Sequence, residues 1–447
     1  MKFAPRILFL LGTGLSLSSV AQAATPIEIW HSFDGASAVV FADLVQRYNQ
    51  QQTEVQVQLT HKGTAQQTVE AALAPAAVRP HLLQVRDDLG EQVMQANISR
   101  PLRGVYQPAF GDDGWFVPNT PSFPRDVLGR PYAYPIAAEV PVLFYNKDAF
   151  AKAGLDPEAP PNTWFALQAV ALKLSQAGAE CPYTTSHQSW IFLENLSSWH
   201  NEPFVLHAKN PAKENPKLKF NALLQVRHVA LMNSWVVSEL LRIKGEDAES
   251  DQSFASGECA VLTSGTGALG EVLANNNFRV GVAPLPYYEE ASNKTWHTQI
   301  GGASLWLIEG KSKEDYKAVA HFLAWFSSTD IAAEWHQRTG YLPVTEAAHA
   351  ATRKSAYYQP WPALETQLHN VGIHTKPLAP GIRLTHWARL RALISKHLNL
   401  TWNQQKPPKQ ALDDAVREGD QLLSSATEPV AVLAKRKGGE KTGKKVQ

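Results

Sequence analysis

The chain has 447 residues, of which 44% are hydrophobic and 19% charged, and its formal net charge is +1. This composition is typical of a globular protein, and the length exceeds what one hydrophobic core holds, so two lobes are expected. The near-neutral charge does not indicate a nucleic-acid partner. No CxxC, HExxH or zinc-type spacing of Cys and His is present, so neither a metal nor another cofactor is predicted.

The N-terminus has the pattern of an export signal. Lys2 and Arg6 form a basic region before a short apolar run, residues 7–20, and the sequence Ala-Gln-Ala at 21–23 is typical of a cleavage site. An uncleaved membrane anchor is the alternative, but the apolar run is short for a helix that spans a bilayer. We therefore expect residues 1–23 to be removed and the protein to be located in the periplasm.

The first part of the mature chain alternates strands and helices. Residues 26–30, 55–59 and 82–85 read as strands, and an apolar stripe predicts a helix between the first two. This order is typical of an α/β lobe with a largely parallel sheet, whose ligands gather beyond the carboxyl ends of the strands. The stripe consists of Phe41, Leu44, Val45 and Tyr48, and the loops at the strand ends are 31–35, 62–66 and 86–90.

The middle of the chain begins with an apolar strand of six residues that turns at Asn146 into a short helix. After a Pro-rich break, Asn162 and Thr163 are candidates to cap the next helix. The second lobe opens near Pro141 and is expected to be mainly helical as far as residue 277.

The last third returns to the first lobe and then leaves it again. Strands are predicted at 278–286 and 300–308. Ser312 with Asp315 forms a capping-box-like helix start. Thr329 is predicted to cap the following helix, which ends at Gly340. The final helix is expected at 409–423, and the Lys-rich residues 431–447 are expected to form a basic, disordered tail.

The chain has two cysteines, Cys181 and Cys259. An oxidising compartment permits one disulfide between them. The sequence does not say whether their Cα atoms approach, and two separate buried thiols fit it equally well.

Three places carry residue types that suit a polar ligand. The first is the turn 263–267, TSGTG, where backbone N–H groups, hydroxyls and a helix N-terminus favour an anion. The second is the pair Gly301-Gly302, which marks a bulge, a close backbone approach or a ligand contact. The third is the segment 383–391 with three arginines, although most arginines are solvated surface residues.

Several long stretches carry a family resemblance. PVLFYNKDAFAKAGLDPE at 141–158, IGGASLW at 300–306, AAEWHQRTGYLPVT at 332–345 and QALDDAVREGDQLL at 410–423 are the main ones. With them the chain resembles the periplasmic glycerol-3-phosphate-binding proteins of Ugp-type ABC importers, within extracellular solute-binding protein family 1.

The resemblance covers nearly the whole mature chain and implies its architecture. The implied fold is α/β, a two-lobe periplasmic-binding-protein fold with a ligand cleft between the lobes and several hinge crossings. The N-terminal lobe would comprise residues 24–139 and 283–343, and the C-terminal lobe residues 140–282 and 344–430.

Position by position, the resemblance also implies a ligand site. Gly302, Tyr341 and Arg391 stand where the family holds a phosphate through a backbone N–H, a phenol and a guanidinium. Trp190 corresponds to a tryptophan that packs on glycerol carbons. Asp87 corresponds to a glutamate that accepts hydrogen bonds from glycerol hydroxyls.

Four positions depart from the family pattern. Ala65 replaces a tyrosine, Glu139 a serine and His187 a second pocket tryptophan, while Gly265 aligns with the serine of the glycine-rich turn. The hydroxyls on either side of Gly265 are candidates to substitute for that serine. The predicted ligand-binding residues are Asp87, Glu139, His187, Trp190, Ser264, Gly265, Thr266, Gly302, Tyr341 and Arg391.

Glu139 is the most consequential departure. A carboxylate a few ångströms from a phosphate costs about 1–4 kcal/mol, depending on the local dielectric. Either Glu139 points away from the site, or a cation lies beside it, or the ligand is not a simple phosphate monoester. A glycerophosphodiester with a cationic head, such as glycerophosphocholine, would bring its own cation, and a neutral sugar or polyol would also suit an acidic acceptor.

An enzyme and a pure adaptor are the competing classes of protein. Carboxylates such as Asp87 and Asp88 suit acid–base roles, but no nucleophile or hydrolytic motif accompanies them, so no catalytic residue is predicted. The favoured hypothesis is a monomeric binding protein that closes over glycerol-3-phosphate or a related glycerophosphodiester. It would deliver this ligand to the transmembrane permease subunits of an ABC importer, whose cytoplasmic ATPase drives uptake.

Overall fold

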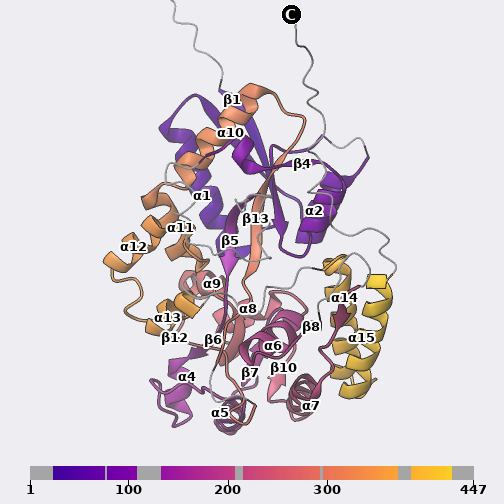
Figure 1. Cartoon of the computed structure of the whole chain (residues 1–447). Coiled ribbons are helices and arrows are strands. Elements are labelled where there is room, and N and C mark those ends of the chain that lie inside the picture. Colours follow the sequence, from indigo (N-terminus) through magenta and orange to yellow (C-terminus); the bar gives the residue numbers. More distant parts are fainter. Residues whose placement is uncertain are drawn as a thin grey trace, which may run out of the picture.

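The computed structural model describes residues 24–75, 78–107, 132–206, 215–291, 295–370 and 384–424. These residues form two lobes, each built on its own sheet (Figure 1). The expected export signal, the basic tail and Arg383 lie outside the described residues. Within the described ranges, no helix combines the length and the apolar character needed to cross a membrane.

The first lobe contains a mixed six-stranded sheet. Its first three strands are parallel, in the order β2-β1-β3, and β13 runs antiparallel to β3, β4 and β5. The expected parallel sheet is therefore right for its first three strands, and the returning strand adds the antiparallel part. The strands are β1 (Thr25–His31), β2 (Val55–His61), β3 (Leu82–Arg86), β4 (Ser99–Arg100), β5 (Tyr134–Glu139) and β13 (Gly301–Ile308).

Helices cover this sheet with the apolar faces that the sequence predicts. Helix α1 buries the whole stripe from Phe41 to Tyr48, and the capping box of Ser312 and Asp315 opens α10. Helix α11 starts at Thr329, but its N-cap is Ser328, one residue before the predicted cap. The helices of this lobe are α1 (Gly35–Gln51), α2 (Ala65–Leu73), α3 (Gly90–Gln95), the 3-10 turn Leu102–Gly104, α10 (Lys313–Phe326) and α11 (Thr329–Thr339).

The second lobe contains a five-stranded sheet in the order β10-β7-β11-β6-β12. Helices make up most of the regular structure between 141 and 277, as expected, and β6 and β12 were predicted as strands. The sheet that joins them was not predicted, because strands of two or three residues are too short to show an alternating pattern. The sheet strands are β6 (Pro141–Asn146), β7 (Tyr183–Thr185), β10 (Leu241–Arg242), β11 (Val261–Gly265) and β12 (Val280–Ala283), and a separate hairpin pairs β8 (Val205–Leu206) with β9 (Lys217–Leu218). Cys181 and Cys259, which precede β7 and β11, form a disulfide with Cα atoms 4.5 Å apart.

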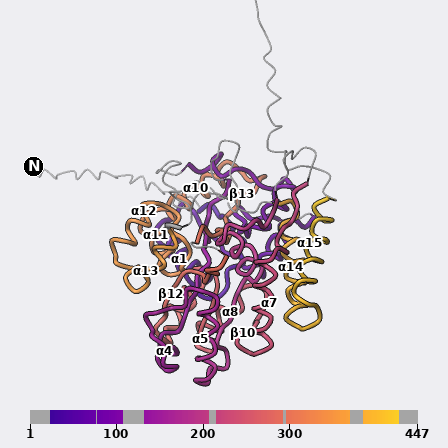
Figure 2. Tube along the Cα trace, turned by 60° about the horizontal axis from the view of Figure 1, so that its bottom comes forward, coloured from indigo at the N-terminus to yellow at the C-terminus, as the bar shows by residue number. Residues whose placement is uncertain are grey.

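Helices of the second lobe bury a core rich in aromatic residues around Trp164, Trp199 and Trp235. Helices α14 and α15, at the C-terminal end of the described chain, lie side by side and pack against α7 (Figure 2). The remaining helices are α4 (Lys147–Lys152), α5 (Trp164–Gln176), α6 (Leu196–Trp199), α7 (Leu223–Val237), α8 (Glu249–Ala255), α9 (Ala268–Asn275), α12 (Glu346–Lys354), α13 (Pro362–Asn370), α14 (Trp387–Trp402) and α15 (Pro408–Ser424).

In the described residues the chain passes between the two sheets from β5 to β6 and returns from β12 to β13. Val140 alone separates β5 of the first sheet from β6 of the second. A third segment, after α11, lies beside the first crossing, because the backbone N–H of Leu342 donates to the carbonyl of Ala138 at 2.7 Å. The lobe ranges given above remain a prediction, and the side chains next to Val140 are placed at the junction of the lobes.

Candidate ligand-binding site

Two cavities of about 370 and 440 Å³ lie where the lobes meet and share part of their walls. Their common residues include Arg86, Glu139, His187 and Gly302. Carboxylates outnumber guanidinium groups in these walls, so the cleft is acidic. The acidic wall residues are Asp34, Asp87, Glu139, Glu246, Asp247, Glu249, Asp251 and Glu271, and the arginines are Arg86, Arg389 and Arg391.

Arg391, on α14, reaches across the cleft to the first lobe. Its Nη1 and Nη2 donate to Asp87 at 2.8 and 3.2 Å, and its Nε and Nη2 donate to Glu194 at 3.0 and 2.8 Å. Burial disfavours the charged guanidinium, but the two carboxylates outweigh this effect and hold the pKa of Arg391 well above its ordinary value. These four hydrogen bonds use all but one of the five N–H groups, so a phosphate that contacts two N–H groups of this arginine competes with the carboxylates.

Glu194 is a site residue that the sequence analysis missed. It lies in the π-helical turn Trp190–Asn195, and its side chain is 2% exposed. A charged residue within the apolar run WIFLENL is a signal that could have identified it, because glutamates are almost never fully buried unless they are paired. π-Helical turns are also frequent at functional sites.

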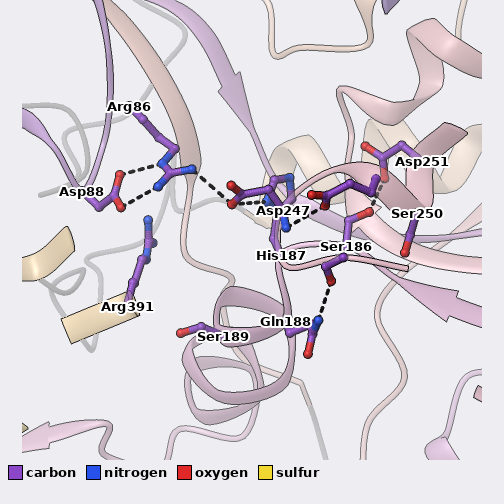
Figure 3. A network of polar contacts seen from close by, with 12 residues as sticks. Arg86, Asp88, Ser186, His187, Gln188, Ser189, Asp247, Ser250, Asp251 and Arg391 are labelled. Atoms are coloured by element: carbon purple, nitrogen blue, oxygen red, sulfur yellow. Dashed lines mark hydrogen bonds and ion pairs between the residues drawn. The ribbon is translucent and has the colours of Figure 1, made fainter. Parts of the chain in front are cut away.

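Arg86, at the end of β3, forms a second group of charged contacts, shown in Figure 3. Its Nε and Nη2 donate to Asp88 at 2.7 and 3.0 Å, and its Nη1 donates to Asp247 of the second lobe at 3.1 Å. Like Arg391, this arginine is therefore already bound to two carboxylates. Both ion-pair groups connect the two lobes across the cleft.

Glu139 points into the cleft and not to solvent. Its Oε2 accepts a hydrogen bond from the backbone N–H of Gly267 at 3.3 Å. The same atom lies 2.0 Å from the position that a Cβ atom on Gly265 would occupy. Burial, with a smaller contribution from the charge of Asp251, raises the pKa of Glu139 to about 8.

Asp251, on α8, is the acidic neighbour of Glu139 and was also missed. The hydroxyl of Ser186 donates to its Oδ1 at 2.6 Å, and burial raises the pKa of Asp251 to about 7. Two carboxyl groups whose pKa values lie near neutrality therefore face the same cavity. Perturbed values of this kind concentrate at functional sites.

Tyr341 and Gly302 both line the cleft, as the prediction requires. The Tyr341 ring stacks on Trp335, and its hydroxyl lies 3.5 Å from Ser37 Oγ. Gly302 has φ +114°, and a Cβ there would lie 1.7 Å from the Ala137 carbonyl oxygen. Only glycine fits at this position, so the close backbone approach explains the residue without any ligand.

His187 and Trp190 stand together on the second lobe. Their rings meet edge to face with centroids 6.2 Å apart, and both line the 370 Å³ cavity. His187 adopts φ +48°, a conformation that is uncommon for residues other than glycine. Burial lowers the pKa of His187 to about 4, so its ring is neutral at physiological pH.

Of the remaining predicted positions, two lie outside the cavity walls and one contributes only space. Ser264 and Thr266 are fully buried and do not belong to the walls of either cavity. Gly265 contributes space, which Glu139 fills. Ala65, at the start of α2, does line the larger cavity. In the described ranges no group of three or more His, Cys, Asp or Glu residues is arranged to hold a metal ion.

Comparison with known proteins agrees with this architecture. Residues 43–366 match the family described as Bacterial extracellular solute-binding protein. The chain is 36% identical over 416 residues to the sn-glycerol-3-phosphate-binding periplasmic protein UgpB of Yersinia pestis, covering 92% of this chain and 94% of that protein. Its identity to the UgpB of Escherichia coli K12 is also 36%, over 420 residues, covering 92% and 96%.

Solved structures with the same fold include the UgpB of Mycobacterium tuberculosis in complex with glycerophosphocholine. It has a TM-score of 0.70 and 21% identity, and the match covers 90% of this chain and 99% of that one. The GacH receptor of Streptomyces glaucescens has a TM-score of 0.71 and 17% identity, covering 90% and 100%. With its two lobes and the cleft between them, the chain belongs to the family of bacterial extracellular solute-binding proteins.

Proposed function

We propose that this protein is the substrate-binding subunit of an ABC importer and captures a glycerol-phosphate solute, either glycerol-3-phosphate or a glycerophosphodiester. The observation that carries the proposal is the position of Arg391, Tyr341, Trp190 and Gly302 around one cleft between the lobes. The 36% identity to glycerol-3-phosphate-binding proteins over 92% of the chain supports it. Residues 1–23 act as the export signal, and the mature protein works in the periplasm.

Arg391 is the proposed contact for the ligand phosphate. Its guanidinium binds Asp87 from the first lobe and Glu194 from its own lobe. A phosphate that enters replaces Asp87 on the guanidinium, because arginine forms charge-assisted bidentate pairs with phosphate as well as with carboxylate. Glu194 stays in place and keeps the guanidinium oriented. Asp87, once released, is free to accept hydrogen bonds from ligand hydroxyls.

Trp190 and Tyr341 form the apolar part of the proposed site. The Trp190 ring lies over Gly301, where a Cβ would come within 3.0 Å of the ring. A flat aromatic surface of this kind packs on the carbon atoms of a glycerol unit. Closure of the lobes about the segments near Val140 and Leu342 then buries the ligand. The closed protein docks on the transmembrane permease subunits, and the cytoplasmic ATPase drives uptake.

A neutral sugar or polyol is the second candidate ligand. The excess of carboxylates in the cleft walls favours it, because carboxylates accept hydrogen bonds from hydroxyl groups without requiring a charge on the ligand.

Isothermal titration calorimetry of the mature protein, purified from the periplasm, tests both candidates. Glycerol-3-phosphate, glycerophosphocholine, glycerol and maltose are each titrated at neutral pH. Saturable binding of at least one phosphate compound, and weaker binding of glycerol, is the expected result. Binding of maltose alone would refute the glycerol-phosphate proposal and leave the sugar candidate.

A further inference from the structure

Arg86 lies at the boundary between the two cavities of the cleft. Its side chain lines both of them, whereas Arg391 belongs to the wall of the 370 Å³ cavity and Tyr341 to the wall of the 440 Å³ cavity. Arg86 is thus the guanidinium that the two cavities share, while the two predicted phosphate contacts belong to one cavity each. It is not among the ligand-binding residues predicted from the sequence.

The two carboxylates that bind Arg86 differ strongly in burial. Nε and Nη2 donate to Asp88 at 2.7 and 3.0 Å, and the Asp88 side chain is 1% exposed. Nη1 donates to Asp247 at 3.1 Å, and the Asp247 side chain is 60% exposed. An ion pair with an exposed carboxylate contributes little to stability, whereas breaking a buried pair leaves an uncompensated charge. Asp247 is therefore the partner that an incoming anion can displace.

Arg391 has no comparable exposed partner in its two ion pairs. The side chains of Asp87 and Glu194 are 5% and 2% exposed. Displacing either of them from Arg391 leaves a buried carboxylate without its cation. Release of Asp247 from Arg86 therefore costs less free energy than release of Asp87 or Glu194 from Arg391.

The local structure allows Asp247 to leave by a rotation of its side chain alone. The carbonyl of Asp247 accepts a hydrogen bond from the N–H of His187 at 2.8 Å, and its own N–H donates to Glu249 Oε2 at 2.9 Å. These two bonds hold the backbone in place. The bidentate contact with Asp88, visible in Figure 3, keeps the plane of the Arg86 guanidinium oriented.

The charges around Arg86 favour an anion at this place. In Figure 3 the guanidinium of Arg391 points toward Asp88, next to Arg86, and the two positive charges are close enough to interact. An anion near both guanidinium groups is attracted by both. Glu139 lines both cavities as well, but burial raises its pKa to about 8, so that its carboxyl is largely protonated at neutral pH. A protonated carboxyl can donate a hydrogen bond to a phosphate oxygen.

We propose that Arg86 is a second phosphate contact of the cleft and that Asp247 is the carboxylate that the phosphate displaces there. This inference rests on the proposed function and adds a residue to its site. The phosphate takes the place of Asp247 on Nη1, and Asp88 keeps the guanidinium oriented. Asp247 also determines how strongly the cleft prefers anionic ligands, because its carboxylate competes with every anion for the same N–H group.

Asp247→Asn tests this competition, because asparagine keeps the shape of the side chain and removes its charge. In calorimetry of the mature protein, this variant should bind glycerol-3-phosphate and glycerophosphocholine about three to five times more tightly than the unmodified protein does. Asp148→Asn is the matched control and should leave both affinities unchanged, because Asp148 forms an exposed ion pair with Arg279 outside both cavity walls. Equal or weaker binding by Asp247→Asn would overturn the inference.

A double-mutant cycle separates competition at Arg86 from a general effect of charge. Arg86→Gln combined with Asp88→Asn removes the buried pair as a whole, so that no carboxylate stays buried without a partner. This change should lower the affinity for both phosphate compounds by about tenfold or more. In its background, Asp247→Asn should alter the affinity by less than about twofold. A gain from Asp247→Asn that is as large in this background as in the unmodified protein would show a general effect of charge and refute the inference.

Arg86→Lys provides a second variant that keeps a cation beside Asp88. One ammonium group cannot reproduce the bidentate contact with Asp88 and bind a phosphate in the same geometry, so both affinities should fall by about fivefold or more. Thermal unfolding of each variant verifies folding. If neither phosphate compound binds the unmodified protein, the proposed function is refuted and the inference with it. Binding that neither change at Arg86 weakens would remove Arg86 from the site and leave the proposed function standing.

Discussion

Replacing Gly265 by serine tests whether Glu139 occupies the space that the glycine leaves open. A Cβ at position 265 would lie 2.0 Å from Glu139 Oε2 and 2.3 Å from its Cδ. The backbone φ of Gly265 is not in the left-handed region, so the change adds no backbone strain. Any destabilisation must therefore come from displacement of Glu139.

The expected magnitude depends on which residue stands at 139. In the otherwise unchanged protein, Gly265→Ser should lower the free energy of unfolding by about 1–3 kcal/mol, the usual effect of overpacking a filled site. In a Glu139→Ser background the clashing atoms are absent, so the same substitution should cost less than about 0.5 kcal/mol. The coupling energy between the two positions is then expected to be about 1–2 kcal/mol.

Urea unfolding of the four proteins of this double-mutant cycle measures the coupling directly. The fluorescence of the many tryptophans follows the transition, and equal slopes across the cycle verify that the variants unfold in the same way. Thr329→Ser, at the exposed first residue of α11, is the neutral control, and its effect shows the scatter of the measured free energies. Effects that add within about 0.5 kcal/mol would refute the placement of Glu139 over Gly265.

Three further predictions follow from the buried charges and the disulfide. Arg391→Ala should abolish binding of the best ligand. It should also lower the free energy of unfolding by about 3–5 kcal/mol, because Asp87 and Glu194 lose their buried partner. Urea unfolding that is unchanged in this variant would contradict the ion pairs. The free energy of unfolding should fall as pH rises from about 4.5 to 8. The pKa values of Glu139 and Asp251 are raised in the folded state, so the folded protein loses their protons over that range. Melting temperatures at pH 5 and 8.5, compared with those of Glu139→Gln, test the direction of this change. The double substitution Cys181→Ser, Cys259→Ser should lower the free energy of unfolding by about 2–4 kcal/mol, because the disulfide closes a long loop. Urea unfolding that matches that of the unmodified protein would show that the disulfide does not contribute to stability.

The parts of the fold that the sequence predicted correctly have strong local signals. Strand β13 reads as an apolar run, and the cap at Ser312 is visible as a sequence pattern. In the second-lobe sheet β6 and β12 were predicted, but β7 and β10 were missed because they span only three and two residues. Such strands form only when neighbouring strands of the same sheet hold them, so their cause is tertiary and not local.

Some residues of the candidate site could likewise be predicted from the sequence and others could not. Arg391 and Tyr341 could be identified from a resemblance that runs through long matching stretches. Glu194 had a local signal that was missed, a charge within an apolar run. Asp251 and Glu271 had none, because a carboxylate in a helix is ordinarily a solvated residue and its burial depends on contacts with distant segments. Arg391 and Glu194 lie 197 positions apart in the chain.

The departures at 139 and 265 are best understood as one change. The resemblance places a serine at both positions, and this chain has a glutamate at one and a glycine at the other. Because the glutamate carboxylate fills the volume above the glycine, Glu139 would clash with a serine at position 265. The pair removes two hydroxyl donors from the cleft and adds one acceptor beside the N-terminus of α9. The coupled exchange therefore places one carboxylate where the resemblance expects two hydroxyl groups.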